Sequence, residues 1–471
     1  MKSLAGSSVL ARCSVLVALG LSPGIAGCAG EEVLSPVPLP GFTVQKGFLR
    51  DRDGRALILR GMNLSGEHKQ APYFSFHTLP DYQRLRSPWG MNAVRFLITW
   101  AAVEPAKGQY DEAYLDALAE RMDWAREAGL LVVLDMHQDV YGEGFANGGG
   151  DGAPRWTCDE SAYESFVPNP SQWFLNYLTA EVTGCYDHFW QSAELRAHYI
   201  EAWRRVAARL DDYDDVIVGF DPMNEPYWGS YAMTGFEADV LSPFYEELGA
   251  ALREVKPRWV AFLEPASSRN LGLPTGLLVP TFGDVVYSPH SYDRDAESGD
   301  GFDPAHRQAV LDNAAKLSDE AKALGAALWI GEYGAQTNAP GVTEYMTAEY
   351  DGFAAACAGS TYWSYSKGGY GALNPDGTEK EELMAALVRP YPERVAGTPK
   401  SCGFDPSTTT FTLTYAPDPG VVKPTVISVP DRAYPNGYRV ECGDCQFESA
   451  PDTLTITTPP TAAEAVITVR P

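Results

Sequence analysis

The sequence predicts an α/β protein: a (β/α)8 barrel, also called a TIM barrel, followed by a smaller antiparallel β-sandwich. Through most of the chain, short β-rich runs alternate with amphipathic helical stretches, a pattern typical of parallel strands joined by crossover helices. After about residue 398 the helical pattern stops and only short, mostly alternating runs remain. The 471 residues are 45% hydrophobic and 12% aromatic, which is enough apolar material for two cores.

Eight candidate strands account for the barrel, and their spacing matches the size and rhythm of this fold. They cover residues 56–62, 93–98, 130–136, 216–221, 259–263, 285–288, 328–331 and 361–363. A doubly wound open sheet is the alternative, but no Gly-rich phosphate loop follows any of these runs. In a (β/α)8 barrel the chemistry lies at the C-terminal ends of the strands, so the residues that close each run are the candidates for a site.

A hairpin and two clear helices accompany these strands. The Asp-Gly step at residues 53–54, within the segment 47–63, is a hairpin turn signal between apolar flanks. Residues 111–128 repeat apolar side chains on one helical face and are followed by Gly129, a favoured residue just beyond a helix C-terminus. Residues 195–210 repeat the same apolar pattern and predict a second helix.

The C-terminal part of the chain predicts the β-sandwich. Its β-rich runs lie at residues 411–415, 425–429, 438–441, 454–458 and 465–469, between turn-forming stretches. We therefore place the barrel, together with its N-terminal hairpin, at residues 42–395 and the β-sandwich at residues 396–471.

The N-terminus has the pattern of a signal peptide, with a basic residue ahead of a short apolar stretch. The stretch ends at Cys28 in Ile-Ala-Gly-Cys, which resembles the lipobox of bacterial lipoproteins, so we expect residues 1–27 to be removed and Cys28 to be lipidated. An ordinary secretory cleavage is the alternative. Residues 28–41 contain three prolines and suit a tether. The chain is thus expected in the bacterial cell envelope, as a lipoprotein, or in the secreted fraction.

The charge of the chain restricts its partners. There are 36 Lys and Arg against 62 Asp and Glu, and the formal net charge is -26, so a phosphate backbone would be repelled and a nucleic-acid partner is excluded. No run after the leader approaches the roughly 20 apolar residues of a membrane span. We expect membrane contact only through the N-terminal lipid or through a substrate's bilayer, and a monomer. The sequence carries no metal-ligand cluster or cofactor fingerprint, so no cofactor and no metal are expected.

Six cysteines remain after the N-terminal segment, an even number that suggests disulfides in an exported protein. Pairing of Cys158 with Cys185 is attractive because both lie in one long insertion. Cys442 and Cys445 have the spacing of a metal or redox pair, but no second pair with ligand spacing accompanies them, which favours a structural bridge.

An insertion of some fifty residues, 139–191, follows the third predicted strand and is far longer than the usual connection in this fold. Nine of the 35 residues from 156 to 190 are aromatic. Long loops on the catalytic face of a barrel commonly shape a substrate site. The alternative is that the rings give the insertion a small core of its own, and one loop can do both.

Polar residues close most of the predicted barrel strands and would meet at one mouth. From the second strand to the eighth they are Arg95; Asp135, His137 and Asp139; Asn224 and Glu225; His290 and Tyr292; Glu332; and Trp363. We assign Asp135 to structure. Glycoside hydrolysis requires two carboxylates across such a mouth, one as acid and one facing the oxocarbenium-like carbon. Glu225 and Glu332 are the candidates, and Arg95 is expected to keep Glu332 ionised.

Four motifs at these strand ends resemble the retaining glycoside hydrolases of family 5. In chain order they are Asn224-Glu225-Pro226, His290-Ser291-Tyr292, Gly331-Glu332-Tyr333-Gly334 and Tyr362-Trp363-Ser364. Within that family the resemblance is strongest to the endoglycoceramidases, which cut the β-glycosidic bond between an oligosaccharide and ceramide. It extends through residues 94–100, 134–141 and 390–399, and covers the chain from about residue 49 to the C-terminus.

This resemblance implies roles for individual residues. Glu225 would be the acid/base and Glu332 the nucleophile, and the supporting residues would be Arg95, Asn224, His290 and Tyr292. The sugar next to the scissile bond would contact Lys69, His137, Asp139, Asn224 and Trp363. The loop 366–375 does not align with the family pattern, and the insertion 158–185 is particular to this chain, which leaves the substrate range open.

The implied activity is hydrolysis of the bond between the reducing-end sugar and ceramide in glycosphingolipids, with a glycolipid or oligosaccharide as partner. Trp228 lies in the apolar loop 227–233 directly after Glu225 and, with the aromatic insertion, would wall a groove for the ceramide. A β-glucosidase or an endo-β-glucanase of the same family is one alternative. A surface lipoprotein that binds glycans without turnover is another, although the presence of both glutamates argues against it.

Overall fold

The computed structural model describes residues 41–471 except residues 66 and 460. The expected signal segment 1–27, the expected lipidation site Cys28 and residues 28–40 of the tether lie outside the described residues. None of the helices in the described part of the chain combines the length and the apolar sequence that a membrane span requires.

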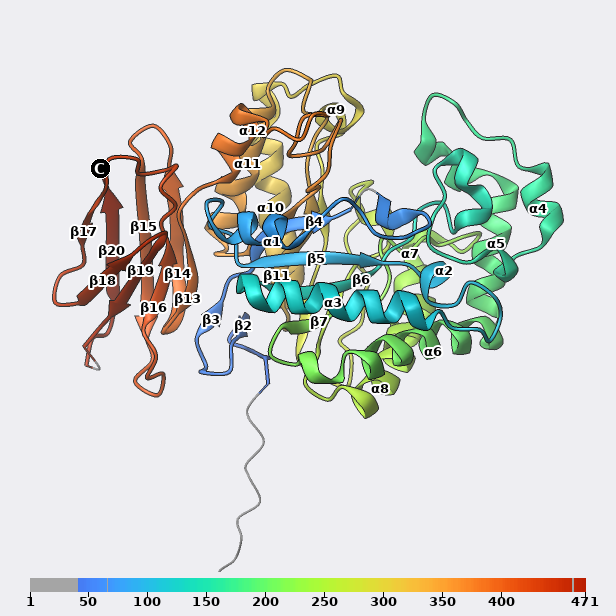
Figure 1. The fold of residues 1–471 in the computed structure, drawn as a ribbon, viewed down its shortest axis with the longest axis horizontal. Coiled ribbons are helices and arrows are strands. Elements are labelled where there is room, and N and C mark those ends of the chain that lie inside the picture. The colour runs from blue at the N-terminus through green and yellow to red at the C-terminus, as the bar shows by residue number, and fades with distance from the viewer. Residues whose placement is uncertain (1–40, 66, 460) are drawn as a thin grey trace, which may run out of the picture. The chain divides into compact units, whose positions relative to one another are not determined.

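Parallel strands form one closed sheet that makes the barrel (Figure 1). In sheet order they are β10 (His290–Ser291), β11 (Ala327–Tyr333), β12 (Gly359–Tyr362), β4 (Arg60–Leu64), β5 (Ala93–Ile98), β6 (Leu131–Met136), β7 (Ile217–Asp221), β8 (Val260–Leu263) and β9 (Val285–Tyr287). Strands β9 and β10 pair with successive parts of β11, so together they fill one barrel position and close the sheet. The predicted eight-position barrel is confirmed.

The first predicted strand, 56–62, is two strands with different partners. β3 (Ala56–Leu57) pairs with β13 (Tyr391–Val395), whereas β4 pairs with β5 and β12 in the barrel. Ala56 packs into the core of the C-terminal domain and Met62 into the core of the barrel. Because both halves are buried, the run is apolar apart from Arg60, and its composition does not reveal the change of partner.

Helices cover the outside of the barrel, and Figure 1 shows α3, α6 and α8 side by side there. The helices are α1 (Leu79–Arg86), α2 (Trp100–Val103), α3 (Glu112–Ala128), α4 (Glu160–Ser165), α5 (Ala180–Gln191), α6 (Ala193–Arg209), α7 (Met233–Phe236), α8 (Ser242–Val255), α9 (Arg294–Ser298), α10 (Arg307–Ala323), α11 (Val342–Ala355) and α12 (Glu381–Leu387). Both predicted helices are present as α3 and α6. The Asp111 side chain caps α3 by accepting the N–H of Tyr114, and Gly129 ends the helix with φ of 72°.

Among the described residues, the connection between β8 and β9 lacks the α-helix that normally joins successive strands of this fold. Between β8 and β9 the described chain forms only a 3-10 turn, Ser267–Arg269. Prolines at positions 265, 274 and 280 explain the missing helix, because proline lacks the backbone donor that a helix interior requires. This loop folds over the mouth of the barrel, where Asn270 reaches Glu225.

The C-terminal domain consists of two antiparallel sheets that share one core. The first contains β1 (Thr43–Gln45), β2 (Phe48–Arg50), β3, β13, β16 (Thr425–Ser428), β19 (Thr453–Thr457) and β18 (Gln446–Ala450); the second contains β14 (Gly397–Asp405), β15 (Thr410–Pro417), β20 (Ala465–Arg470) and β17 (Arg439–Glu441). Ile427 and Leu454 of the first sheet pack with Leu413 and Ile467 of the second. The predicted antiparallel β-sandwich is confirmed.

Strands β13, β14 and β18 of this domain lie outside the five predicted runs. β14 contains glycine and proline and does not alternate, and β18 is exposed at every residue, so neither carries the apolar pattern of a half-buried strand. The predicted N-terminal hairpin is present as β2 and β3, but it extends the first sandwich sheet through β13. The sequence of a hairpin does not say which sheet it joins.

The insertion 139–191 forms short helices around an aromatic core of its own. Besides α4 and α5 it contains the 3-10 turns Glu143–Gly148, Arg155–Thr157 and Trp173–Leu178. Phe145 packs edge to face against Tyr163 and Phe166, with 4.9 Å between ring centroids in each pair. A disulfide joins Cys158 to Cys185, and a second joins Cys442 to Cys445, as the sequence favours.

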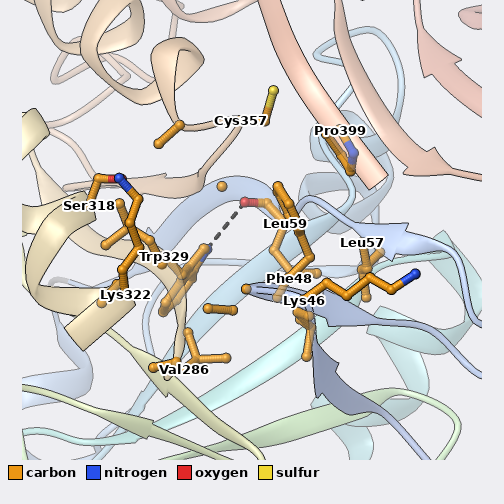
Figure 2. Close-up of a pocket in the computed structure, with 18 of the residues that line it drawn as sticks. Lys46, Phe48, Leu57, Leu59, Val286, Ser318, Lys322, Trp329, Cys357 and Pro399 are labelled. Carbon is orange, nitrogen blue, oxygen red and sulfur yellow. Dashed lines mark hydrogen bonds between the residues drawn. The ribbon is translucent and has the colours of Figure 1, made fainter. Parts of the chain in front are cut away.

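A pocket of about 270 Å³ lies at the N-terminal ends of β4, β11 and β12 (Figure 2). Its lining includes Leu57, Leu59, Trp329 and Cys357, and the Trp329 indole donates a hydrogen bond to the Leu59 carbonyl at 3.2 Å. None of the predicted site residues lines this pocket, because they lie at the opposite ends of the strands.

Candidate active site

The predicted site residues meet at the C-terminal ends of the barrel strands. Arg95 lies in β5 and Glu332 in β11, while Glu225 follows β7 and Trp363 follows β12. The register of β10 against β11 places His290 directly opposite Glu332. The parallel register of the barrel thus gathers residues that are far apart in the sequence.

Glu225 combines a partly exposed carboxyl with an unusual backbone conformation. Its side chain is 19% exposed, and its φ of 39° lies in the left-handed region that residues other than glycine rarely adopt. Its N–H donates to Glu264 Oε2 at 2.8 Å, and its Oε1 accepts Asn270 Nδ2 at 2.7 Å and lies 2.7 Å from His290 Nδ1. Three neighbours therefore hold this strained residue in one orientation.

Glu332 is buried and is bound at both oxygens. Arg95 Nη1 donates to Oε1 at 2.6 Å, and the Tyr292 hydroxyl donates to Oε2 at 2.8 Å. Burial raises the pKa of Glu332, while His290 and Arg95 act in the opposite direction. Arg95 thus acts in the expected direction, towards the ionised carboxylate, although its effect on the pKa is smaller than that of burial.

The two glutamates are close enough for one particular mechanism. An oxygen of Glu225, an oxygen of Glu332 and a ring nitrogen of His290 all lie within 4.8 Å of one another. Retaining glycosidases separate their carboxyl groups by about 5–5.5 Å, whereas inverting enzymes leave about 6.5–9.5 Å for a water molecule. The short separation is that of a retaining site.

Arg95 is fully buried and organises the floor of the site. Its guanidinium nitrogens lie 2.6 to 3.0 Å from carboxylate oxygens of Asp135, Asp221, Glu264 and Glu332. Burial alone would lower the pKa of Arg95, but these carboxylates raise it well above its usual value. Arg95 therefore stays charged and holds four acidic side chains in fixed positions.

Glu264 is a site residue that the sequence analysis missed. Its Oε1 lies 2.6 Å from Arg95 Nη2 and 3.1 Å from His290 Nε2, and its Oε2 accepts the N–H of Glu225. Glu264 directly follows β8, the fifth barrel strand, whose end supplied no candidate. The strand-end rule, applied to that strand as well, would have found it.

Two asparagines complete the contacts of Arg95. Asn63 and Asn224 accept hydrogen bonds from its guanidinium at 3.0 and 2.9 Å. Asn224 also donates through Nδ2 to the carbonyl of Gln138 at 3.1 Å. Asn63, at the end of β4, is a second residue that the sequence analysis missed, and it too occupies a strand end.

The residues expected to contact the sugar form a second cluster. Lys69 pairs with Asp139, lies 3.6 Å from Asp151, and has its Nζ 4.8 Å from the centre of the Trp363 ring. The His137 ring stacks on Trp363 at 5.4 Å and an interplanar angle of 15°. Although burial acts the other way, Lys69 and His137 lower the pKa of Asp139. The cluster presents charged donors and acceptors beside one aromatic face.

Asp135 has the structural role assigned to it. It is buried, it pairs with Arg95 through one oxygen, and its other oxygen lies 2.8 Å from His137 Nδ1. This contact orients the imidazole so that Nε2 lies 3.5 Å from Asp139. Burial and Lys69 act to lower the pKa of His137, but Asp135 and Asp139 raise it to about 9.

Trp228 belongs to an aromatic wall beside these clusters. Among the described residues it packs on Tyr227, with 4.2 Å between ring centroids, and it takes no part in the hydrogen-bonded network of the glutamates. Tyr227 contacts Tyr177 and Tyr186 of the insertion at 5.0 and 5.1 Å. The Tyr177 hydroxyl donates to Asp139 Oδ1 at 3.3 Å, so the wall begins next to the charged cluster.

The outer surface of this wall is apolar and open to solvent. Trp173 and Phe174 are each 45% exposed and Leu178 is 65% exposed, all in the 3-10 turn that also carries Tyr177. Met233, at the start of α7 after the Trp228 loop, is 39% exposed. The insertion therefore has a core of its own, and its Tyr177 also reaches the charged cluster of the site.

Replacing Glu264 by glutamine is expected to lower the pKa of His290. Burial acts to lower the pKa of His290, but Glu264 and Glu332 raise it well above its usual value. Glu225 contributes to this increase through its contact with Nδ1. Glutamine removes one negative charge yet leaves an oxygen to accept the Glu225 N–H. The alkaline limb of kcat/KM, measured against pH on a soluble aryl β-glycoside, should move down by about one unit.

Asp221→Asn is the matched control for this change. Asp221 pairs with Arg95 at 3.0 Å, and His290 Nε2 faces Glu264 instead, so replacing Asp221 by an amide leaves the carboxylate partners of His290 in place. The alkaline limb should stay in place in Asp221→Asn. Equal shifts in both variants would contradict a specific role for the Glu264 charge.

The site as a whole defines a class of protein. Two glutamates lie close together at the C-terminal mouth of a (β/α)8 barrel, one buried against arginine and one partly exposed. This arrangement is typical of the active site of a retaining glycoside hydrolase.

Comparison with protein families agrees with this class. Residues 50–369 match the cellulase model of glycosyl hydrolase family 5, and residues 389–470 match the model of the glycoside hydrolase family 5 C-terminal domain. The chain belongs to glycoside hydrolase family 5.

Individual relatives place it near the endoglycoceramidases. The chain is 29% identical over 444 residues to endoglycoceramidase I of Rhodococcus hoagii (strain 103S), covering 89% of this chain and 86% of that one. The endo-glycoceramidase II of Rhodococcus sp., solved as a complex with ganglioside GM3, superposes with a TM-score of 0.83 at 34% identity, covering 91% of this chain and 100% of that one. Sterylglucosidase 1 of Cryptococcus neoformans, at 16% identity and a TM-score of 0.79 over 92% of this chain and 97% of that one, shares the fold.

Proposed function

We propose that this glycosidase hydrolyses the β-glycosidic bond between the reducing-end sugar and ceramide in glycosphingolipids. Glu332 is the nucleophile and Glu225 the acid/base in a double displacement. The observation that carries the assignment is the asymmetry of the pair: Glu332 is buried and bound by Arg95 and Tyr292, whereas Glu225 is partly exposed. The similarity to two endoglycoceramidases supports the choice of substrate.

In the first displacement Glu332 attacks the anomeric carbon, while Glu225 transfers its proton to the glycosidic oxygen and the ceramide alcohol leaves. Arg95 and Tyr292 hold the two oxygens of Glu332, which fixes the direction of attack. In the second displacement Glu225, now a carboxylate, takes a proton from water, and the resulting nucleophile displaces Glu332 from the sugar. The anomeric configuration is retained because each step inverts it.

His290 connects the two glutamates through this cycle. Its Nδ1 lies 2.7 Å from Glu225 Oε1 and 3.5 Å from Glu332 Oε2. A cationic imidazole there stabilises Glu332 as an anion before attack and Glu225 as an anion after it has given up its proton. Glu264, on the far side of the ring, keeps the imidazole charged.

The charged cluster provides the donors and acceptors for the sugar at the scissile bond. Lys69 donates, Asp139 accepts, and the half-buried Trp363 ring offers a face to the sugar. His137 is held by Asp135 with Nε2 free of any hydrogen bond among the described residues, so it is available to a hydroxyl. Asn224 keeps a second N–H besides the one that it gives to Gln138, and we assign this donor to the 2-hydroxyl.

The aromatic wall accounts for the apolar part of the substrate. Tyr227 and Trp228 follow the acid/base after Pro226, and Tyr227 contacts Tyr177 in the turn of the insertion that also carries the exposed Trp173 and Phe174. A leaving group with two hydrocarbon chains would gain about 25 cal/mol for each Å² of apolar surface that it covers there. The two disulfides support the expectation of export, since such bridges form in oxidising compartments.

Replacing Trp228 by serine is expected to lower kcat/KM on a glycosphingolipid by about tenfold or more, because part of the apolar contact with ceramide is lost. Turnover of a short aryl β-glycoside should change less than about twofold. Trp124→Ser is the matched control, since Trp124 is also half-buried but lies on the outer helix α3. Equal losses on both substrates would contradict a ceramide contact for Trp228.

The substrate class is tested by incubating the enzyme separately with a ganglioside, a galactosylceramide and a cello-oligosaccharide. Mass analysis should show an intact oligosaccharide and free ceramide from the ganglioside. Turnover of the cello-oligosaccharide alone would favour an endo-β-glucanase or a β-glucosidase, and binding of the ganglioside without any turnover would favour a glycan-binding lipoprotein.

A further inference from the structure

Two cysteines of the described chain remain as thiols in the structure. Four of the six cysteines in residues 41–471 form the bridges Cys158–Cys185 and Cys442–Cys445, which leaves Cys357 and Cys402. One of the existing bridges lies in the barrel insertion and the other in the C-terminal domain. A chain that acquires both has folded where thiols are oxidised, so the chemistry that formed them was available to the remaining pair as well.

The two cysteines come from different domains and both contact one carbonyl, Cys357 through its backbone N–H and Cys402 through its thiol. Cys357 lies between the end of α11 and the start of β12, and its N–H donates to the carbonyl of Ala354 at 3.1 Å. Cys402 lies on β14, and its thiol contacts the same carbonyl at 3.6 Å. The two side chains also form a hydrogen bond with each other, and this contact, together with burial, raises the pKa of the Cys357 thiol.

Packing around the pair fixes this proximity. Helix α11 rests against β14, the strand on which Cys402 lies three residues after Pro399. Figure 2 shows Cys357 and Pro399 around the same pocket, on the wall where the barrel faces the C-terminal domain. Cys357 is buried and Cys402 is partly exposed, so the pair is protected on the barrel side but can be reached by an oxidant from the other.

We propose that Cys357 and Cys402 form a third disulfide that joins the barrel to the C-terminal β-domain in the mature protein. The S–S bond forms as both thiols lose their hydrogens, and the two electrons pass to a disulfide-bonded oxidant of the oxidoreductase class that forms disulfides, which leaves as a dithiol. No other oxidant or cofactor is needed. Neither cysteine belongs to any group of metal-ligating side chains in the described residues.

The bridge would stiffen the part of the barrel that carries Trp363. Cys357 stands two residues before β12, and Trp363 directly follows that strand. Positions 357 and 402 are 45 residues apart, so closing this loop restricts the unfolded chain much more than the Cys442–Cys445 bridge, whose partners are three residues apart.

Peptide mapping without reduction tests the bridge directly. The full chain is exported into an oxidising compartment, its free thiols are alkylated under denaturing conditions, and it is digested and weighed by mass spectrometry. The expected product is one cross-linked peptide pair containing Cys357 and Cys402, lighter by two hydrogens than the two thiol peptides together. Alkylated Cys357 and Cys402 in a sample that contains both other bridges would overturn the proposal.

Thermal unfolding supplies the second test. The variants Cys357→Ser, Cys402→Ser and the double variant should all show the same decrease in Tm, about 5–10 °C. Removing either cysteine removes the whole cross-link. The matched control Cys442→Ser with Cys445→Ser should lose less than half as much. A double variant whose loss is the sum of the two single losses would show two independent buried thiols and would overturn the proposal.

Discussion

Replacing Glu332 by glutamine is expected to lower kcat at least about 10³-fold on every substrate of the enzyme. An amide oxygen is too weak a nucleophile to displace the glycosidic oxygen, whereas the shape of the side chain and an oxygen for Arg95 and Tyr292 are preserved. The measurement is the release of ceramide from a ganglioside and of phenol from an aryl β-glycoside, each followed over time.

Glu297→Gln is a matched control for this loss. Glu297 lies on α9, and burial together with Glu225 and Glu332 raises its pKa to about 7, so it is a carboxyl near the same pair with no assigned chemistry. It should keep most of its activity. Full activity of Glu332→Gln with an unchanged Tm would remove Glu332 from the nucleophile role.

Replacing Glu225 by glutamine is expected to slow the hydrolysis of glycolipids much more than the first displacement on an aryl glycoside. Glycolipid hydrolysis should fall about 10³-fold, because the ceramide alkoxide is a poor leaving group and needs a proton from the acid. An aryl glycoside with a strongly acidic phenol needs no proton, so its first displacement, measured as a burst of phenol, should slow less than about tenfold. The second displacement should be slow for both, since the base that activates water is missing.

This contrast distinguishes the two glutamates in one experiment. Only the loss of the nucleophile abolishes the phenol burst, and only the loss of the acid/base leaves a burst followed by slow turnover. The opposite pattern, with a burst in Glu332→Gln and none in Glu225→Gln, would exchange the assigned roles. Added azide should speed the second step of the Glu225 variant, because a small anion needs no base to attack the sugar.

The strand-end rule explains why so much of the site was predictable. In a parallel barrel the register brings every strand end to one mouth, so a glutamate after the fourth strand and another in the seventh must face each other. Arg95, His290 and Tyr292 follow from the same rule, and the structure brings all three into contact with Glu225 or Glu332.

Hydrogen bonds across the barrel were not predictable in the same way. Glu264 accepts the N–H of Glu225 and pairs with Arg95 and His290, residues from three other strand positions. No local pattern indicates these partners, because the contacts arise only when the barrel closes. The left-handed φ of Glu225 is likewise maintained by its neighbours, since its own residue type disfavours that conformation.

The sequence by itself determined the barrel, the sandwich and the residues that close most of the strands, because alternation, helical period and strand-end position are local signals. The tertiary structure decided which sheet receives the N-terminal hairpin, where Ala56 pairs with Val395. It also decided the contact between Cys357 and Cys402 and the hydrogen bond from Glu225 to Glu264. Each of these joins segments far apart in the chain, and such pairings depend on how the whole molecule packs.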